Sequence, residues 1–408
     1  MLIGPYGYSI VAKNLCKGLK EAGHNPWIIS TLPTGNLIRD EYGTPNIPPK
    51  NDVYAKDCLR DYIKGLDIDC VITILDTWTP QSYEIPGIVH SMKIPIISHV
   101  TARSCPLSPM WSTFLENVDH IVAPTNWGQE IINDVFPERT SYIQHGVDMN
   151  KFRPNKDSRE EMRKRLGYSD KFVFLAIGRN REAQKRYDRL FKAFQAFITS
   201  YPELKEKVVL HIHADAHENY NLEDLKNMGF FYLGKDLIKF SRAKWNGQKL
   251  ELCNQNDTNA MPLNPNWGLD EEEMAKVYNM ADCYITAAEA ESFNMPCMEA
   301  QACGLPSIVP NSSVFPELVG KPETGIVCKI ITEETTPMLT DVWLVDMVDM
   351  ARAMHRMYYD TQTRELCSKN ALQNSKKYDW KEAIKKWVFV IEKICEPRFD
   401  YKTKRLGF

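Results

Sequence analysis

Short apolar runs alternate with longer mixed segments along the whole chain. The runs lie at residues 26–29, 70–75, 94–98, 120–123, 141–144, 172–177, 208–213, 230–233, 282–286 and 306–309. Runs of this length suit β-strands, and the segments between them can hold crossover helices. The alternation therefore predicts an α/β fold in which parallel sheets carry helices on both faces.

Two domains are expected from the length and from one polar segment. A chain of 408 residues can form two domains with a core each. The run 155–159, Asn-Lys-Asp-Ser-Arg, has the composition of a connection between domains. We therefore expect a first domain at 1–154, a second at 155–378, and a final helix with a tail at 379–408.

Composition and charge exclude some classes of partner. A formal net charge of −3 argues against a broad nucleic-acid surface, so a ligand with phosphate groups would need a local pocket of cations. The spacing of the 11 cysteines fits neither a metal site nor a framework of disulfides. We therefore expect reduced thiols and a cytoplasmic location. No apolar run is long enough to span a bilayer, which leaves peripheral contact with a membrane open.

The chain opens with a glycine-bearing loop. Only Leu2 and Ile3 precede Gly4 and Gly7, so either the first strand is short or the native chain starts before Met1. A glycine loop that leads into a helix can approach a phosphate or a sugar closely. A tight strand-to-helix turn explains two glycines equally well.

The segment 289–304 combines a helix start with two carboxylates. Pro296 suits the first residue of a helix, and Gly304 suits the position just after its end. A loop that leaves a parallel strand and enters a helix directs its N–H groups at the ligand crevice, which suits a phosphate. Glu291 lies in this loop and Glu299 in the first helical turn, where carboxylates can accept hydrogen bonds from hydroxyl groups.

A cationic loop follows the first strand of the second domain. Arg179, Arg181, Lys185 and Arg186 come directly after Gly178. Composition alone favours a solvated loop. The alternative is a pyrophosphate site, in which the planar arginine and the compact lysine would bind different phosphate oxygens.

Several histidines and one aspartate follow or lie on predicted strands. His99 ends one strand at the crevice side, and Asp76, after the preceding strand, has a weaker claim to a role. A lone histidine is more often a packing or surface residue than a catalytic one. His211, His213 and His217 could hold a metal, but a buried strand with polar partners is the better explanation.

The residues Glu291, Ser292, Phe293, Asn294 and Glu299 resemble the signature E-[GS]-[FW]-[GN]-x4-E. This signature is typical of retaining GT-B glycosyltransferases, specifically glycosyltransferase family 4. Gly178, Arg179 and Lys185 are similar to the phosphate-binding pattern G-R-x5-K of the same family, with Arg186 where the family often has glycine.

Further segments resemble this family in the same order along the chain. Residues 145–154 are similar to N-G-V-D-x3-F-x-P, although His145 stands where asparagine is usual. Residues 315–319 and 324–327 are similar to its P-E-x-[VI] and T-G-x-[VL] segments. The resemblance covers nearly the whole second domain and, more loosely, the first.

The resemblance implies a GT-B architecture. Two Rossmann-like domains, each with a doubly wound parallel sheet, would face each other across a cleft, and the C-terminal helix would cross back to the first domain. The first domain would bind an acceptor that the sequence does not identify, and the second a nucleotide diphosphate sugar. Neither a metal nor another cofactor is expected.

The resemblance also implies four catalytic residues. Arg179 and Lys185 would stabilise the charge that develops on the diphosphate leaving group. Glu291 would orient sugar hydroxyls, and His99 would meet the sugar from the first domain. Because the sequence offers no carboxylate as a nucleophile on the opposite sugar face, same-face transfer is implied.

Further residues are expected to contact the donor. They are Gly4, Gly7, Gly178, Ser292, Phe293, Asn294 and Glu299. The N–H groups of Phe293 and Asn294 would face the diphosphate, and Glu299 would accept from the ribose. The loop with Gly4 and Gly7 would lie against donor and acceptor.

Two other functions fit the same architecture. A sugar-nucleotide epimerase shares the diphosphate pocket but needs acid and base residues on either side of the sugar carbon. A non-catalytic GT-B binding protein would need no intact set of donor residues. The match at 289–304 and the cations at 178–186 favour the glycosyltransferase.

Overall fold

The computed structural model describes residues 7–29, 37–77, 79–180, 184–218, 221–227, 235–263, 268–320 and 323–403. The chain forms two compact units. The first contains residues 1–146 and 336–340 and the chain from Trp380 onward, and the second contains residues 147–335 and 341–379.

The first unit is built on a four-stranded parallel sheet in the order β4-β5-β6-β7. Its strands are β4 (Val71–Ile74), β5 (Ile96–His99), β6 (His120–Ala123) and β7 (Thr140–Tyr142). A separate three-stranded sheet has the order β1-β3-β2, with β1 (Ile28–Ile29), β3 (Pro45–Ile47) and β2 (Ile38–Arg39). The helices are α1 (Gly7–Glu21), α2 (Leu59–Gly65), α3 (Ile85–Ser91), α4 (Pro109–Leu115), α5 (Asn126–Asn133) and α13 (Trp380–Thr403).

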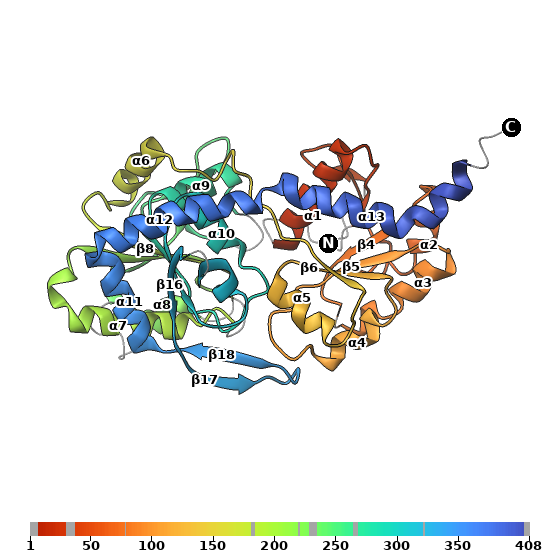
Figure 1. The fold of residues 1–408 in the computed structure, drawn as a ribbon. Helices are drawn as coiled ribbons and strands as arrows, with labels where there is room; N and C mark the ends of the chain where they lie inside the picture. The colour runs from red at the N-terminus through yellow and green to blue at the C-terminus, as the bar shows by residue number, and fades with distance from the viewer. Residues whose placement is uncertain are drawn as a thin grey trace. The chain divides into compact units, whose positions relative to one another are not determined.

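Helices cover both faces of this sheet because successive strand residues point to opposite sides. Ile96 packs in the core that α2, α3 and α4 share, whereas Ile97 packs with residues of α1 and α13. A Cβ atom at Gly18 would overlap Ile384, so a glycine lets α1 approach α13 closely. Figure 1 shows these two helices side by side. The prediction that the C-terminal helix returns to the first domain is confirmed.

The second unit is built on a six-stranded parallel sheet in the order β10-β9-β8-β14-β15-β16. Its strands are β8 (Phe172–Ile177), β9 (Val208–His213), β10 (Ile238–Phe240), β14 (Cys283–Ile285), β15 (Ser307–Pro310) and β16 (Gly325–Cys328). Its helices are α6 (Lys156–Leu166), α7 (Tyr187–Ser200), α8 (Leu222–Asn227), α9 (Glu271–Asn279), α10 (Met295–Ala302), α11 (Met347–Tyr359) and α12 (Thr361–Ser375). Phe174 and Leu175 point into separate cores on the two faces.

The predicted α/β class with parallel sheets is confirmed in both units. The strand predicted at 230–233 lies outside the described residues. The described chain also contains a hairpin of β17 (Ile330–Thr335) and β18 (Asp341–Val345).

The division between the units falls at residue 146, ahead of the residue 154 expected from composition. The segment after it is tied to the second unit. Val147 N donates to Tyr378 O over 2.7 Å, and Phe152 packs edge-on against Tyr278 with 5.8 Å between ring centroids. These contacts are made with residues far along the chain, so the composition of 155–159 could not reveal them.

The segment 234–267, whose Asn-rich composition predicts an irregular insertion, contains an ordered antiparallel sheet. It consists of β11 (Arg242–Trp245), β12 (Leu250–Cys253) and β13 (Met261–Pro262) in the order β12-β11-β13. Ala243 and Leu252 are paired across β11 and β12 and are fully buried in the core of the second unit. The expectation of an irregular segment was wrong for these residues, because strands of two to four residues between Asn-containing turns are too short to show a clear alternating pattern.

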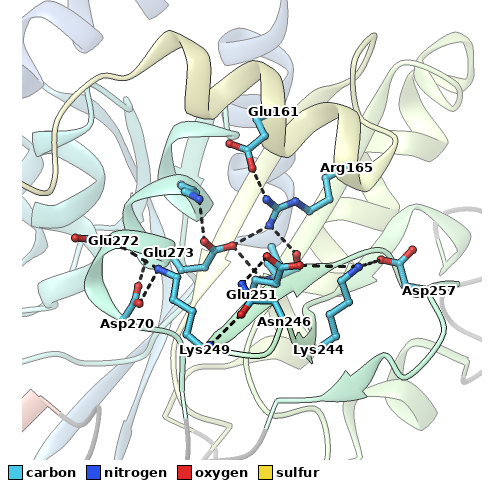
Figure 2. A network of polar contacts seen from close by, with 12 residues as sticks. Glu161, Arg165, Lys244, Asn246, Lys249, Glu251, Asp257, Asp270, Glu272 and Glu273 are labelled. Atoms are coloured by element: carbon cyan, nitrogen blue, oxygen red, sulfur yellow. Dashed lines mark hydrogen bonds and ion pairs between the residues drawn. The ribbon is translucent and has the colours of Figure 1, made fainter.

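A buried carboxylate joins this small sheet to α6 and α9 (Figure 2). Glu273 of α9 is 1% exposed, and its Oε1 accepts from Arg165 Nη1 over 3.0 Å and from Leu252 N over 3.2 Å. Lys276 Nζ lies 3.1 Å from its Oε2. Both carboxylate oxygens therefore have cationic partners inside the protein.

We expect Glu273→Ala to lower the free energy of unfolding by about 1–3 kcal/mol, because it removes the carboxylate acceptor of the buried Leu252 amide and one of the two carboxylates that face Arg165, which keeps Glu161. Urea unfolding followed by circular dichroism measures this change. The matched control is Glu272→Ala, since that side chain is 75% exposed on the same helix and its loss should change stability by less than about 0.5 kcal/mol. Equal effects of the two substitutions would contradict the role of Glu273.

Candidate functional site

Two loops that the sequence analysis singled out meet at the carboxyl edge of the second unit's sheet. One follows β8 and the other follows β14, and these strands are direct neighbours in the sheet. Glu289 N donates to Gln184 O over 3.0 Å, and Gln184 Nε2 donates to Ala290 O over 3.3 Å. The carboxyl edge of a parallel sheet is where ligands bind in open α/β folds.

Lys185 and Glu291 form an ion pair across this junction. Both side chains are largely buried, so the pair is shielded from solvent. The stem of Lys185 runs over Gly178, where a Cβ atom would lie 2.9 Å from Lys185 Cε. A side chain at position 178 would force the lysine stem to shift from this path, which is a physical reason for a glycine at this spacing from the lysine.

Arg179 pairs with an acidic residue that the sequence analysis did not identify. Its Nε donates to Glu218 Oε1 over 2.8 Å. Glu218 follows β9, the other neighbour of β8, so it reaches Arg179 through the strand order. No local sequence signal connects the two residues, which are 39 positions apart.

Arg186 is held by two glutamates. Its Nε donates to Glu289 Oε2 over 2.7 Å and its Nη2 to Glu334 Oε2, on β17, over 3.1 Å. Its φ of 46° lies in the left-handed region, which is the conformation that glycine adopts most easily. Arg181 lies outside the described residues.

Every described cation of the loop at 178–186 therefore has a carboxylate partner. Arg179, Lys185 and Arg186 face Glu218, Glu291, Glu289 and Glu334. The loop is a network of ion pairs rather than a patch of bare positive charge. An anion that binds here must share or replace carboxylate partners.

Asn294 caps the start of α10. It has a φ of 59°, and its Oδ1 accepts from Cys297 N over 2.9 Å and from Tyr284 Oη over 3.0 Å. The helix begins at Met295, so Pro296 lies one residue later than the predicted first position. Gly304 follows the end of the helix with a φ of 80°, and the prediction for this residue is confirmed.

Phe293 and Ser292 precede the cap. Phe293 is buried and packs against Tyr378 with 5.8 Å between ring centroids. Ser292 is half-buried, and the neighbouring Glu291 N donates to Ser313 Oγ over 3.0 Å. These contacts hold the loop rigidly ahead of α10.

Glu299 lies one turn deeper in α10 than expected, because the helix begins at Met295. Its Oε2 accepts from Tyr278 Oη, on α9, over 2.5 Å. Burial raises the pKa of the Glu299 carboxyl from 4.5 to about 7. Nothing in the sequence indicated that the Tyr278 hydroxyl would face Glu299, 21 positions away.

His99 lies in the interior of the first unit. It is 1% exposed, its Nε2 is 2.9 Å from His145 Nε2, and the two rings stack with 4.9 Å between centroids. Trp387 of α13 packs beside them. Burial lowers the pKa of His99 to about 4, so the ring is neutral at neutral pH.

Of the two opening glycines, the structure describes only Gly7. It is the first residue of α1 and not part of a loop ahead of the helix, whereas Gly4 lies outside the described residues. Next to Gly7, Tyr8 Oη donates to Asp76 Oδ1 over 2.7 Å and lies 2.9 Å from Thr101 Oγ1. Tyr8 of α1 thus contacts two residues that follow β4 and β5. Of these three residues, only Asp76 was considered for a role from the sequence.

The histidines on β9 have the polar partners that the sequence analysis favoured. His211 Nε2 and His213 Nδ1 each lie 2.8 Å from Ser241 Oγ, and Tyr168 Oη lies 3.0 Å from His211 Nδ1. Within the described ranges, no group of three or more His, Cys, Asp or Glu residues is arranged to hold a metal ion. Nor is any helix there long and apolar enough to cross a membrane.

Comparison with known proteins places this site in context. Residues 266–335, which include the loop and α10, match the family model for glycosyl transferases group 1. The family resemblance read from the sequence is confirmed.

The chain is also similar to a D-inositol 3-phosphate glycosyltransferase of Saccharomonospora viridis, with 25% identity over 248 residues, 61% of this chain and 48% of that protein. The chain thus spans about half the length of this relative.

Solved structures confirm the GT-B architecture. The fold is similar to a glycosyltransferase from Rickettsia africae, with a TM-score of 0.70, 15% identity and 94% of each chain covered. It is also similar to Anabaena Alr3699/HepE in complex with UDP and glucose, with a TM-score of 0.70, 14% identity, and 95% of this chain and 96% of that chain covered. At these identities the similarity concerns the fold.

The raised pKa of Glu299 predicts a pH dependence of stability. Between pH 4.5 and about 7 the folded chain keeps a proton that the unfolded chain releases, so this carboxyl makes folding less favourable as pH rises through that window. We expect the melting temperature of wild type, relative to Glu299→Gln, to fall from pH 4.5 to 7 and to level off above it. Differential scanning calorimetry measures this, with the exposed Glu272→Gln as control. A pH-independent difference would contradict the assignment.

Proposed function

We propose that the chain is a retaining glycosyltransferase that moves a sugar from a nucleotide diphosphate sugar to an acceptor. One observation carries the proposal. The loops after β8 and β14 join at the carboxyl edge of the second unit, and there the Lys185–Glu291 pair places a cation and a hydroxyl acceptor side by side. A diphosphate with an attached sugar needs both kinds of group.

The names of similar proteins support this class of donor. Relatives are called D-inositol 3-phosphate glycosyltransferases, and one solved neighbour contains UDP and glucose. In our proposal Arg179, Lys185 and the N-terminus of α10 stabilise the charge that develops on the diphosphate. Lys185 would then exchange part of its contact with Glu291 for a phosphate oxygen.

The carboxylates have separate roles in this proposal. Glu291, freed in part from Lys185, accepts from hydroxyls of the transferred sugar, and Glu299 accepts from the ribose. A phosphate oxygen of the leaving group takes the acceptor proton on the face from which it departs, which retains the anomeric configuration. No metal is required, because cationic side chains and helix N–H groups stabilise the diphosphate. The role expected for His99 stays a prediction.

The direct test uses nucleotide diphosphates and nucleotide sugars. A thermal-shift series should identify a diphosphate that raises the melting temperature, because a ligand that binds only the folded state stabilises it. The matching nucleotide sugar is then incubated with candidate acceptors, and NMR of the anomeric proton reports the configuration of the product. Conversion of the sugar nucleotide without any acceptor would identify an epimerase instead. An inverted product would contradict the retaining mechanism.

Lys185→Ala should lower turnover by about 100- to 1,000-fold, since the loss of one preorganised charge-stabilising group costs about 2.7–4 kcal/mol in the transition state. Steady-state kinetics with the identified donor measure this. Lys192→Ala, at an exposed position of α7 in the same chain, should transfer at the wild-type rate. Near-wild-type turnover of a folded Lys185→Ala variant would refute the role of Lys185.

Transfer should also persist after exhaustive treatment with EDTA, because the proposed charge stabilisation uses side chains and backbone N–H groups. The assay compares initial rates before chelation, after chelation and after the addition of Mg²⁺. Activity that disappears with EDTA and returns with Mg²⁺ would show that a metal takes part.

A further inference from the structure

The carboxyl edge of the first unit's sheet carries a cluster of polar side chains outside the proposed donor site. β4 and β5 are parallel neighbours whose last residues, Ile74 and His99, are register partners. The loops that follow these strands therefore start at one edge, where open α/β folds bind ligands. Asp76 follows β4, Thr101 and Arg103 follow β5, and all three residues are half-buried.

Tyr8, in the first turn of α1, determines how the hydrogen bonds of this cluster run. A phenol has one proton, and Tyr8 Oη donates it to Asp76 Oδ1 over 2.7 Å. The hydroxyl of Thr101, whose Oγ1 lies 2.9 Å from the same phenol oxygen, must then donate to Tyr8. Burial raises the pKa of Tyr8, and the charge of Asp76 raises it further, so the phenol keeps its proton at neutral pH.

Two oxygens of the cluster still have lone pairs to offer. Among the described residues, no donor faces Asp76 Oδ2, and the only bond of Thr101 Oγ1 is the one in which it donates to Tyr8. Neither oxygen has a proton left to donate. Both therefore suit the hydroxyl groups of a ligand, which can donate to them.

Arg103 adds a positive charge to this edge. Its charge opposes the rise in the pKa of Tyr8, which places the guanidinium near the cluster. Within the described ranges this guanidinium makes no hydrogen bond and no ion pair. The described cations of the loop at 178–186, by contrast, all face carboxylates. A guanidinium whose donors are unused can bind a phosphate or a carboxylate through two parallel N–H groups.

We propose that this edge binds the sugar acceptor, and that the acceptor is a sugar or polyol with one anionic group, either a phosphate ester or a carboxylate. Arg103 binds the anionic group, and Asp76 and Thr101 accept from two hydroxyls. This inference rests on the proposed function, since a sugar acceptor is needed only if the chain transfers sugars. It adds the chemical class of the acceptor, which the donor residues do not specify.

The test measures binding to the full chain by isothermal titration calorimetry, without any donor. The probes are two matched sets: glucose, glucose 6-phosphate and glucuronate, and glycerol, glycerol 3-phosphate and glycerate. Inorganic phosphate is titrated as well. We expect an anionic member of at least one set to bind at least tenfold more tightly than both its neutral partner and inorganic phosphate. The phosphate and carboxylate members distinguish the two kinds of anionic group.

Arg103→Gln should weaken binding of the preferred anionic probe by about 10- to 150-fold, the range for a lost hydrogen bond to a charged group. Its affinity for the neutral partner should not change. Arg103→Lys keeps the charge without the planar fork and should lose less. The matched control is Arg60→Gln, which removes the same charge from an exposed position on α2 and should leave every affinity unchanged. Melting temperatures verify that each variant is folded.

Three results would overturn the inference. They are equal affinities for the neutral and anionic members of both sets, unchanged affinity in Arg103→Gln, and a loss of anion binding in Lys185→Ala instead. The last result would place the anion at the proposed diphosphate site.

The failure of this inference can be distinguished from the failure of the proposed function. Binding through Arg103 in a chain that transfers no sugar would contradict the proposed function and leave the binding site in place. Transfer to neutral sugars without any preference for anionic ones would contradict only the class of acceptor.

Discussion

The parallel pairing of β8 with β14 is the constraint on which the candidate site depends. The two strands are separated by more than 100 residues of sequence, yet Phe174 and Cys283 are register partners. Parallel strands end at the same edge of the sheet, so the loops that follow them must meet. The cationic loop and the acidic loop therefore share one place, and Lys185 reaches Glu291 across it.

This arrangement gives the site a balance of charge that composition could not reveal. A loop rich in arginine and lysine suggests a positive surface, but the described cations are each paired with a carboxylate from another loop or strand. Such pairs hold the side chains in fixed positions. The cations are therefore already oriented when a phosphate ligand binds, but the ligand would compete with the carboxylates for contact with them.

Local features of the site were predictable because they depend on neighbouring residues. α10 ends before Gly304 because this residue adopts a left-handed backbone conformation. Its start depends on the capping side chain of Asn294 and on Pro296, whose fixed φ suits the first turn. The glycine of the cationic loop was predicted from a family pattern, and the structure adds the reason, since Lys185 lies against it. By contrast, the antiparallel sheet at 242–262 was missed because its short strands carry no strong periodic signal.

The sequence by itself determined the α/β class, the family resemblance and the positions of the two site loops, since these depend on short-range patterns of apolar, glycine and charged residues. Only the tertiary structure decided which groups meet. It paired Arg179 with Glu218, gave Glu299 a tyrosine partner, and placed His99 in the interior against His145. The physical reason is that strand order brings distant residues together, and burial then changes the protonation of those it encloses.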